Sequence, residues 1–169
     1  MRQMVLTTGS FPKDQILNDL EKHDIRFNRY AEEYFSHPRF RSDHSRTFTV
    51  TIASLQEIGF DNGATLPEIF RSLPEAGLKP CSPETGLFLR LIWTDQPKSS
   101  NAILSGTHEA PDQAVTVLSE ILDNSDDFPK GLYLRNVDDF LWLRGYICNS
   151  EYRFPGESIF AFEKIGQTR

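Results

Sequence analysis

The first part of the chain has the apolar spacing of helices. Residues 10–25 predict a helix with Ser10 as the N-cap and Pro12 in the first turn, where its missing N–H costs little. A second helix is predicted to end before Pro38, because its apolar side chains recur at i, i+3, i+4, i+7 and i+8. These side chains are Phe27, Tyr30, Ala31, Tyr34 and Phe35. We therefore expect residues 1–45 to be a helical N-terminal part.

The pattern changes to alternation at residues 46–53, "RTFTVTIA", which predicts a half-buried strand. A short helical turn is expected in "SLQEIGF", residues 54–60. Thr65 and Glu68 then stand three apart in the manner of a capping box, with Pro67 in the first turn of a further helix. Gly77 is placed to end that helical region.

Beyond Gly86 the apolar runs predict strands. The run "GLFLRLIWT", residues 86–94, is apolar on both faces and is typical of a strand covered on both sides. Strands are also expected in "AILSGT", "GLYLRNV", "FLWLRGYIC" and "SIFAFEKI", while "AVTVLSEIL" suits a strand or a short helix. The short break "NVDD" predicts a hairpin. The order of elements favours one α+β domain, residues 1–169, with N-terminal helices packed on a mostly antiparallel sheet of about five or six strands; residues 46–165 form its α+β core.

Composition narrows the class of protein. The chain has 169 residues, 38% hydrophobic and 25% charged, which is typical of a globular domain. No apolar run approaches the ~20 residues that cross a bilayer, and no signal-peptide core is visible. The two cysteines, Cys81 and Cys148, could form one disulfide, but without an export signal free thiols are favoured, and we expect a cytoplasmic protein. A net charge of −6 disfavours nucleic acid as a partner, although three arginines around Phe40 invite that hypothesis. These are Arg39, Arg41 and Arg46.

Strong catalytic and metal signatures are absent from the sequence. It contains no P-loop, no dinucleotide-binding glycine motif, no nucleophile elbow and no H-E-x-x-H. His37, Asp43 and His44 could form a metal site, but a polar loop explains them better. The acidic run "DNSDDF" lacks the Gly and Glu positions of an EF-hand. We expect no metal site and no cofactor.

Cys81 is the candidate nucleophile, since a thiolate needs a nearby base or positive charge. His108 and Arg90 could supply these if the fold brings them close. The alternative is that Cys81 is a small buried hydrophobic residue at the turn into the next element.

Arg90 lies between Leu89 and Leu91, and a buried guanidinium is costly unless it is paired. One interpretation is an internal ion pair with Glu84 or Asp95. The other makes Arg90 the anion-binding group of a pocket, with the remaining members of a candidate ligand site around it. That candidate site comprises Glu84, Arg90, Trp93, Asp95 and Gln96.

The run "ATLPEIF…AGLKPCSPETGLFLRLIWTDQP" resembles a family of uncharacterised bacterial proteins. The shared features are a T-x-x-E-I helix, a Gly-Leu leading to Cys81, Glu84 and Gly86, an L-R-L segment and a final Asp-Gln-Pro. The resemblance covers about residues 47–164. It departs at Pro83, one place later than expected, and at Trp93, where a tyrosine is expected. It implies a bacterial cytoplasmic protein and no particular reaction, cofactor or catalytic residue.

The sequence thus leaves three functions open. The first is a non-enzymatic binding or accessory protein with a groove near Arg90 for a small anionic ligand or a peptide partner. The second is a small enzyme acting on a nucleotide-like or acyl substrate through Cys81 or Asp95. The third is a protein–protein interaction module, which would have an exposed apolar patch among the aromatic residues of the C-terminal strands.

Overall fold

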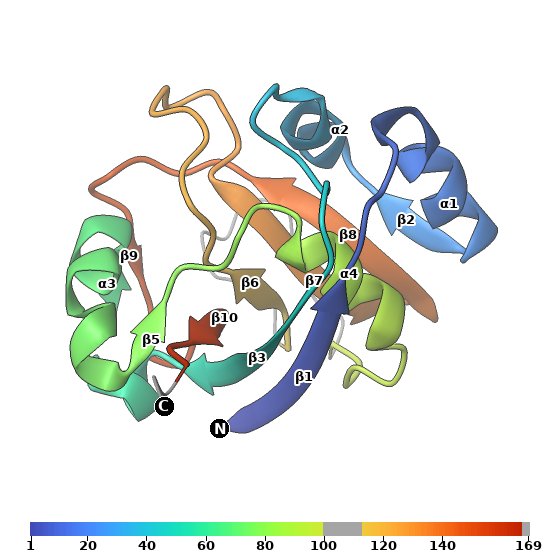
Figure 1. Cartoon of the computed structure of the whole chain (residues 1–169). Coiled ribbons are helices and arrows are strands. Elements are labelled where there is room, and N and C mark those ends of the chain that lie inside the picture. The colour runs from blue at the N-terminus through green and yellow to red at the C-terminus, as the bar shows by residue number, and fades with distance from the viewer. Residues whose placement is uncertain (100–112, 167–169) are drawn as a thin grey trace.

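The computed structural model describes residues 1–99 and 113–166. Its main feature is a curled eight-stranded sheet in which seven strands follow the order β1-β3-β10-β6-β7-β8-β2, with β5 beside β10 (Figure 1). The strands are β1 (Arg2–Thr8), β2 (Ile25–Phe27), β3 (Arg46–Ser54), β5 (Leu78–Lys79), β6 (Val115–Val117), β7 (Gly131–Val137), β8 (Phe140–Tyr146) and β10 (Ile159–Lys164). A second sheet pairs β4 (Ala64–Thr65) with β9 (Arg153–Phe154).

The predicted α+β class is confirmed, and the sheet is larger than the five or six strands expected. Most pairs are antiparallel, but β10 pairs in parallel with β6, and β2 pairs in parallel with β8. The strand count was too low because β1, β2 and β5 give little signal in the sequence. Two of these have only two or three residues.

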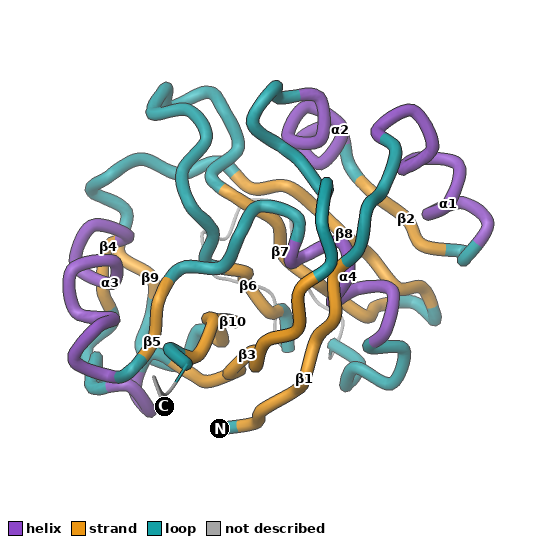
Figure 2. Tube along the Cα trace, viewed as in Figure 1, coloured by secondary structure: helices purple, strands orange, loops and turns teal. Residues whose placement is uncertain are grey.

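In the part of the chain that the structure describes, four α-helices cover the sheet: α1 (Ile16–Lys22), α2 (Arg29–Ser36), α3 (Leu66–Ser72) and α4 (Thr85–Ile92). Figure 2 shows α1, α2 and α4 grouped around β1, β2 and β8, while α3 lies at the other end beside β9. The hydrophobic core correspondingly consists of two clusters of buried side chains. One joins Leu20, Tyr34 and Leu87 to the sheet, and the other packs Ile69 against Phe160.

Several local predictions are confirmed. Residues 46–54 form β3, a short 3-10 turn follows at Gln56–Ile58, and the Thr65–Glu68 capping box starts α3. Gly77 adopts the left-handed conformation, with φ of 71°, where the helical region ends. The hairpin between β7 and β8 turns through two residues of positive φ, as a tight type I′ turn requires.

The run at residues 85–92 is a helix, α4, and the strand prediction there is wrong. Leu87, Leu89 and Arg90 are all buried, because α4 is enclosed on most sides between the sheet and the N-terminal segment. An enclosed helix is apolar on nearly every face, as a covered strand is, and a run this short does not separate the two by periodicity.

The helical N-terminal part also needs correction. Residues 2–8 form β1, residues 25–27 form β2, and α1 begins at Ile16 after a 3-10 turn rather than at Ser10. The second predicted helix is confirmed as α2, although its N-cap is Asn28 and Phe27 belongs to the preceding strand. Within "AVTVLSEIL", residues 115–117 are a strand. The segment "AILSGT" and His108 lie outside the described residues.

Candidate ligand-binding site

The structure brings three of the five candidate residues together in the interior. Arg90 is completely buried, and Trp93 and Gln96 are nearly so. The guanidinium donates to the Gln96 Oε1 at 2.6 Å and to the Trp93 carbonyl, with longer contacts of 3.4 and 3.5 Å to the carbonyls of Trp142 and Arg135. Arg90 therefore ties the end of α4 to β7 and β8.

Neither predicted carboxylate pairs with this guanidinium. Glu84 accepts a hydrogen bond from the Ser82 hydroxyl at 2.8 Å, and Asp95 is exposed. The prediction of an ion pair to Arg90 is wrong because α4 turns the Arg90 side chain inward, away from Glu84 at the start of the same helix. Burial without a carboxylate lowers the pKa of Arg90 to about 10.

Cys81 is fully buried, and its thiol contacts the Ala161 carbonyl at 3.8 Å. Burial raises the pKa of this thiol far above its ordinary value, and the nearby Glu163 charge acts in the same direction. Cys81 thus has neither the access nor the thiolate character of a nucleophile. Cys81 is instead packed as a small residue of the hydrophobic core.

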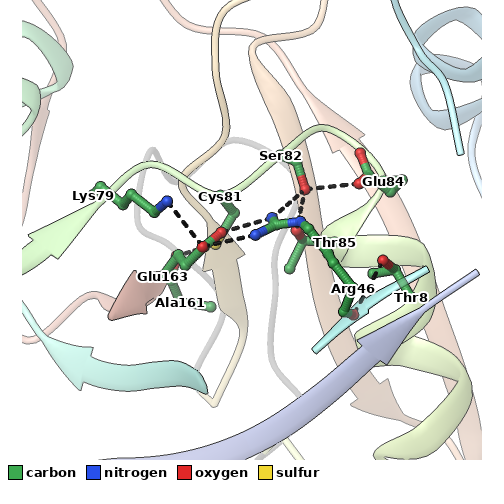
Figure 3. A network of polar contacts seen from close by, with 9 residues as sticks. All are labelled: Thr8, Arg46, Lys79, Cys81, Ser82, Glu84, Thr85, Ala161 and Glu163. Atoms are coloured by element: carbon green, nitrogen blue, oxygen red, sulfur yellow. Dashed lines mark hydrogen bonds and ion pairs between the residues drawn. The ribbon is translucent and has the colours of Figure 1, made fainter. Parts of the chain in front are cut away.

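A charged cluster lies directly over Cys81, built from three neighbouring strands (Figure 3). Arg46 begins β3, Lys79 ends β5 and Glu163 lies in β10, directly opposite Lys79. Both Glu163 oxygens accept from Arg46, at 2.8 and 2.7 Å, and Lys79 approaches to 3.1 Å. The fork-to-fork geometry fixes both side chains.

The Glu163 carboxylate is charged although only 4% of the residue is exposed. Burial alone raises the pKa of Glu163, but the hydrogen bonds and charges of Arg46 and Lys79 outweigh that effect and lower the pKa below its ordinary value. Arg46 is held further by Ser82 at 2.9 Å and by the Phe48 ring at 3.8 Å. The cluster is thus preorganised.

This cluster forms the floor of an open pocket of about 500 Å³. The pocket lies between the segment that leads into β3 and the loops that flank β5 and follow β6. It is lined by Arg39, Arg41, Asp43, His44, Arg46, Lys79, Pro80, Ser82, Glu84, Glu120 and Glu163. Four arginine or lysine side chains face four carboxylates, so the lining has no formal net charge with His44 neutral. Of the predicted site residues, Glu84 lies here.

The segment with three arginines around Phe40 divides between the core and the charged pocket. Phe40 is buried against Tyr34 and Phe35, so it offers no ring to a base, while its neighbouring arginines line the charged pocket. In residues 1–99 and 113–166 no three His, Cys, Asp or Glu side chains form a group that could hold a metal ion. Within the same residues, no helix has the length and apolar character needed to cross a membrane.

The sequence missed Lys79 and Glu163 as site residues. Glu163 stands in the alternating strand "SIFAFEKI" at a position that faces the core, and a charge at such a position was the available signal. Its partner Arg46 is 117 residues away, which no local pattern reveals.

In comparison with known proteins, no family model, curated protein or solved structure matches the chain. The resemblance to a bacterial family therefore depends only on the residues quoted for it.

Proposed function

We propose that the protein is a non-enzymatic binding protein whose ligand occupies the charged pocket over Arg46, Lys79 and Glu163. The ligand class is a small zwitterion, such as a free amino acid or a short peptide with charged ends. The observation that carries the proposal is an ordered ion cluster, built on the buried Glu163, at the floor of an open pocket whose walls carry both signs of charge.

The balance of charge favours a ligand that also carries both signs. A purely anionic ligand would meet four carboxylates in the lining, and a purely cationic one would meet four basic side chains. Because the floor is already ordered by its own hydrogen bonds, a bound ligand would lose free energy only to ordering the exposed side chains of the lining.

The exposed side chains of the lining supply the groups that a ligand could reach. Arg41, Asp43, His44 and Glu120 are all exposed, whereas Glu163 is occupied by its two partners. An enzyme acting through Cys81 has less support, because that thiol is buried beneath the cluster. Asp95 lies exposed and outside this pocket.

The test is calorimetric titration with free amino acids and dipeptides, compared with the same compounds carrying an N-acetyl group and a C-terminal amide. We expect heat of binding from the zwitterions and none from the blocked compounds. Arg41→Ala and Glu120→Gln should each weaken binding about tenfold, since each removes one charged contact.

Arg71→Ala is the matched control, because Arg71 is an exposed arginine in α3 that does not line the pocket. It should leave the affinity unchanged. Failure of every zwitterion to bind would contradict the proposal, as would binding that the Arg41 and Glu120 variants do not alter.

A further inference from the structure

The strand β1 forms one edge of the main sheet. All seven of its residues pair with β3 on one side. On its other side no strand pairs with it among the described residues, and Figure 1 shows β1 running from the N-terminus at the end of the sheet, with α4 next to its second half. The outward backbone N–H and C=O groups of this strand thus have no strand partner in residues 1–99 and 113–166, and such groups can pair with another extended chain.

The strand lacks several of the features that prevent pairing at a sheet edge. From Gln3 to Thr8 the strand has no charge, no proline and no glycine, and its register with β3 contains no bulge. Val5 points outward with 69% of its surface exposed. The opposite edge differs, since β2 has only three residues and carries Arg26 at its centre.

The side chains of β1 are also complementary to themselves. In an antiparallel pair centred on Val5, each Val5 faces the Val5 of a second copy, and Gln3 faces Thr7 on the same outer surface. On the core-facing surface Met4 faces Leu6. No like charges oppose one another in this register, and the central pairs are apolar.

We propose that two copies of the chain associate through β1, in antiparallel register about Val5, to form one continuous sheet across a two-fold axis. This goes beyond the ligand-binding function and uses none of the pocket residues. A second copy is favoured as the occupant over an unrelated peptide because this one strand supplies both halves of a matched pair. Isologous pairing of this kind closes after two copies.

The axis stands perpendicular to the sheet, so it puts both α4 helices on the same side. α4 packs with β1 in the same core cluster, and its last residue, Ile92, is 50% exposed. Two seven-residue strands alone bury less surface than the roughly 1,200 Å² of a stable interface. We therefore expect a dimer that dissociates on dilution.

A disulfide tests the register directly. In a Cys148→Ser background, Val5→Cys should form an intermolecular disulfide under mild oxidation. Residues directly opposite in an antiparallel pair have Cβ atoms about 4.5–5.5 Å apart, close to what a disulfide needs. Gln3→Cys is the matched control: its two thiols would lie about 14 Å apart along the strands and should stay reduced.

Light scattering after size exclusion supplies the second test. The wild-type protein should approach twice its mass of 19.4 kDa as its concentration rises. Val5→Lys should remain monomeric, and Val5→Thr should still dimerise. Circular dichroism checks that each variant folds. We expect each to fold because Val5 is exposed.

A wild-type protein that is monomeric at every concentration would overturn the proposal. So would a dimer that Val5→Lys leaves intact, because its interface would then lie elsewhere. Equal cross-linking through positions 3 and 5 would overturn the register. Because Val5 lies outside the charged pocket, amino-acid binding should be the same in Val5→Lys, which separates this result from failure of the proposed function.

Discussion

Glu163 is an acid whose charge depends on its neighbours. It is buried in β10 and paired with Arg46 and Lys79, and its pKa is lower in the folded protein than the ordinary 4.5. A group of this kind contributes stability that is complete above its unfolded pKa and is lost as the pH falls through its folded pKa. The cluster therefore stabilises the fold at neutral pH and weakens below about pH 4.5.

Replacing this carboxylate should show the same dependence. We expect Glu163→Gln to lower the free energy of unfolding by about 2 kcal/mol at neutral pH, less than for a fully buried pair because Arg46 is partly exposed. Urea unfolding at neutral pH and near pH 3 should show that the difference from wild type shrinks in acid. Glu151→Gln, an exposed change, is the control. An equal difference at both pH values would contradict the linkage.

Arg90 stabilises the fold in another way, through an amide and backbone carbonyls rather than a carboxylate. Arg90→Met should cost about 3 kcal/mol of unfolding free energy, because several buried carbonyls lose their donor. Gln96→Ala should act through the same network, so the two effects should not add in the double variant. Additive effects in chemical denaturation would indicate that the 2.6 Å bond between them contributes little.

At the scale of elements, Asn28 joins α2 to the sheet. Its Oδ1 accepts from the Ala31 N–H at 2.9 Å, which caps α2, and from the Gly145 N–H at 2.8 Å, while its Nδ2 donates to the Gly145 carbonyl at 3.0 Å. The side chain thus continues the hydrogen bonding between β2 and β8 beyond the last paired residues of the two strands. Gly145 permits this contact, because a Cβ there would lie 2.5 Å from the Tyr30 carbonyl carbon.

Two substitutions test this junction. Asn28→Ala should cost about 2–3 kcal/mol, since it removes a helix cap and two bonds to a strand. Gly145→Ala should cost at least as much, because backbone atoms of α2 must move to admit the methyl group. Gly9→Ala, where a Cβ would meet nothing within 4 Å, is the control for glycine replacement. Equal midpoints of thermal unfolding for Gly145→Ala and Gly9→Ala would contradict this account.

The elements that the sequence predicts correctly are those with local signals. Thr65 and Glu68 mark the start of α3, and the alternation of residues 46–53 marks β3. The helix α4 and the strand β1 were missed because their conformation is decided by what surrounds them. An enclosed helix has no polar face to show its period, and β1 has only three apolar residues in a row.

At the scale of the whole molecule, the two thiols occupy different environments. Cys81 is completely buried beneath the charged cluster, whereas Cys148 is partly exposed and lines a second pocket of about 300 Å³. Burial raises the pKa of Cys148 to about 11, so its thiolate is scarce at neutral pH. In the native protein Cys148 should therefore react slowly, and Cys81 should be protected by its burial.

Iodoacetamide labelling measures the difference. In the native protein Cys148 should react slowly, and faster as the pH approaches 11, while Cys81 should stay protected until the chain unfolds. Peptide mass analysis assigns the label to each site, and labelling in urea shows that both thiols can react. Rapid native labelling of Cys81 would contradict its place in the core and would revive the enzyme hypothesis.

The candidate site could be predicted only in part. Glu84 lies in the charged pocket, but Arg90, Trp93 and Gln96 form a separate buried group. Closeness in sequence suggested that all of them meet, whereas α4 separates them by directing Arg90 inward. The Arg46–Glu163 pair that defines the floor joins strands far apart in the chain, so it is visible only once the sheet is assembled.

The position of β10 bears on how the chain assembles during synthesis. This strand lies between β3 and β6 and joins the β1–β3 pair to the β6–β7–β8–β2 group. Until residues 159–164 leave the ribosome, the two groups have no strand between them, and β3 keeps an open edge. The nascent chain therefore exposes a pairing site for the whole time that the intervening hundred or so residues are made. A ribosome stalled before residue 159 should hold two partial sheets that a chaperone or a protease can recognise.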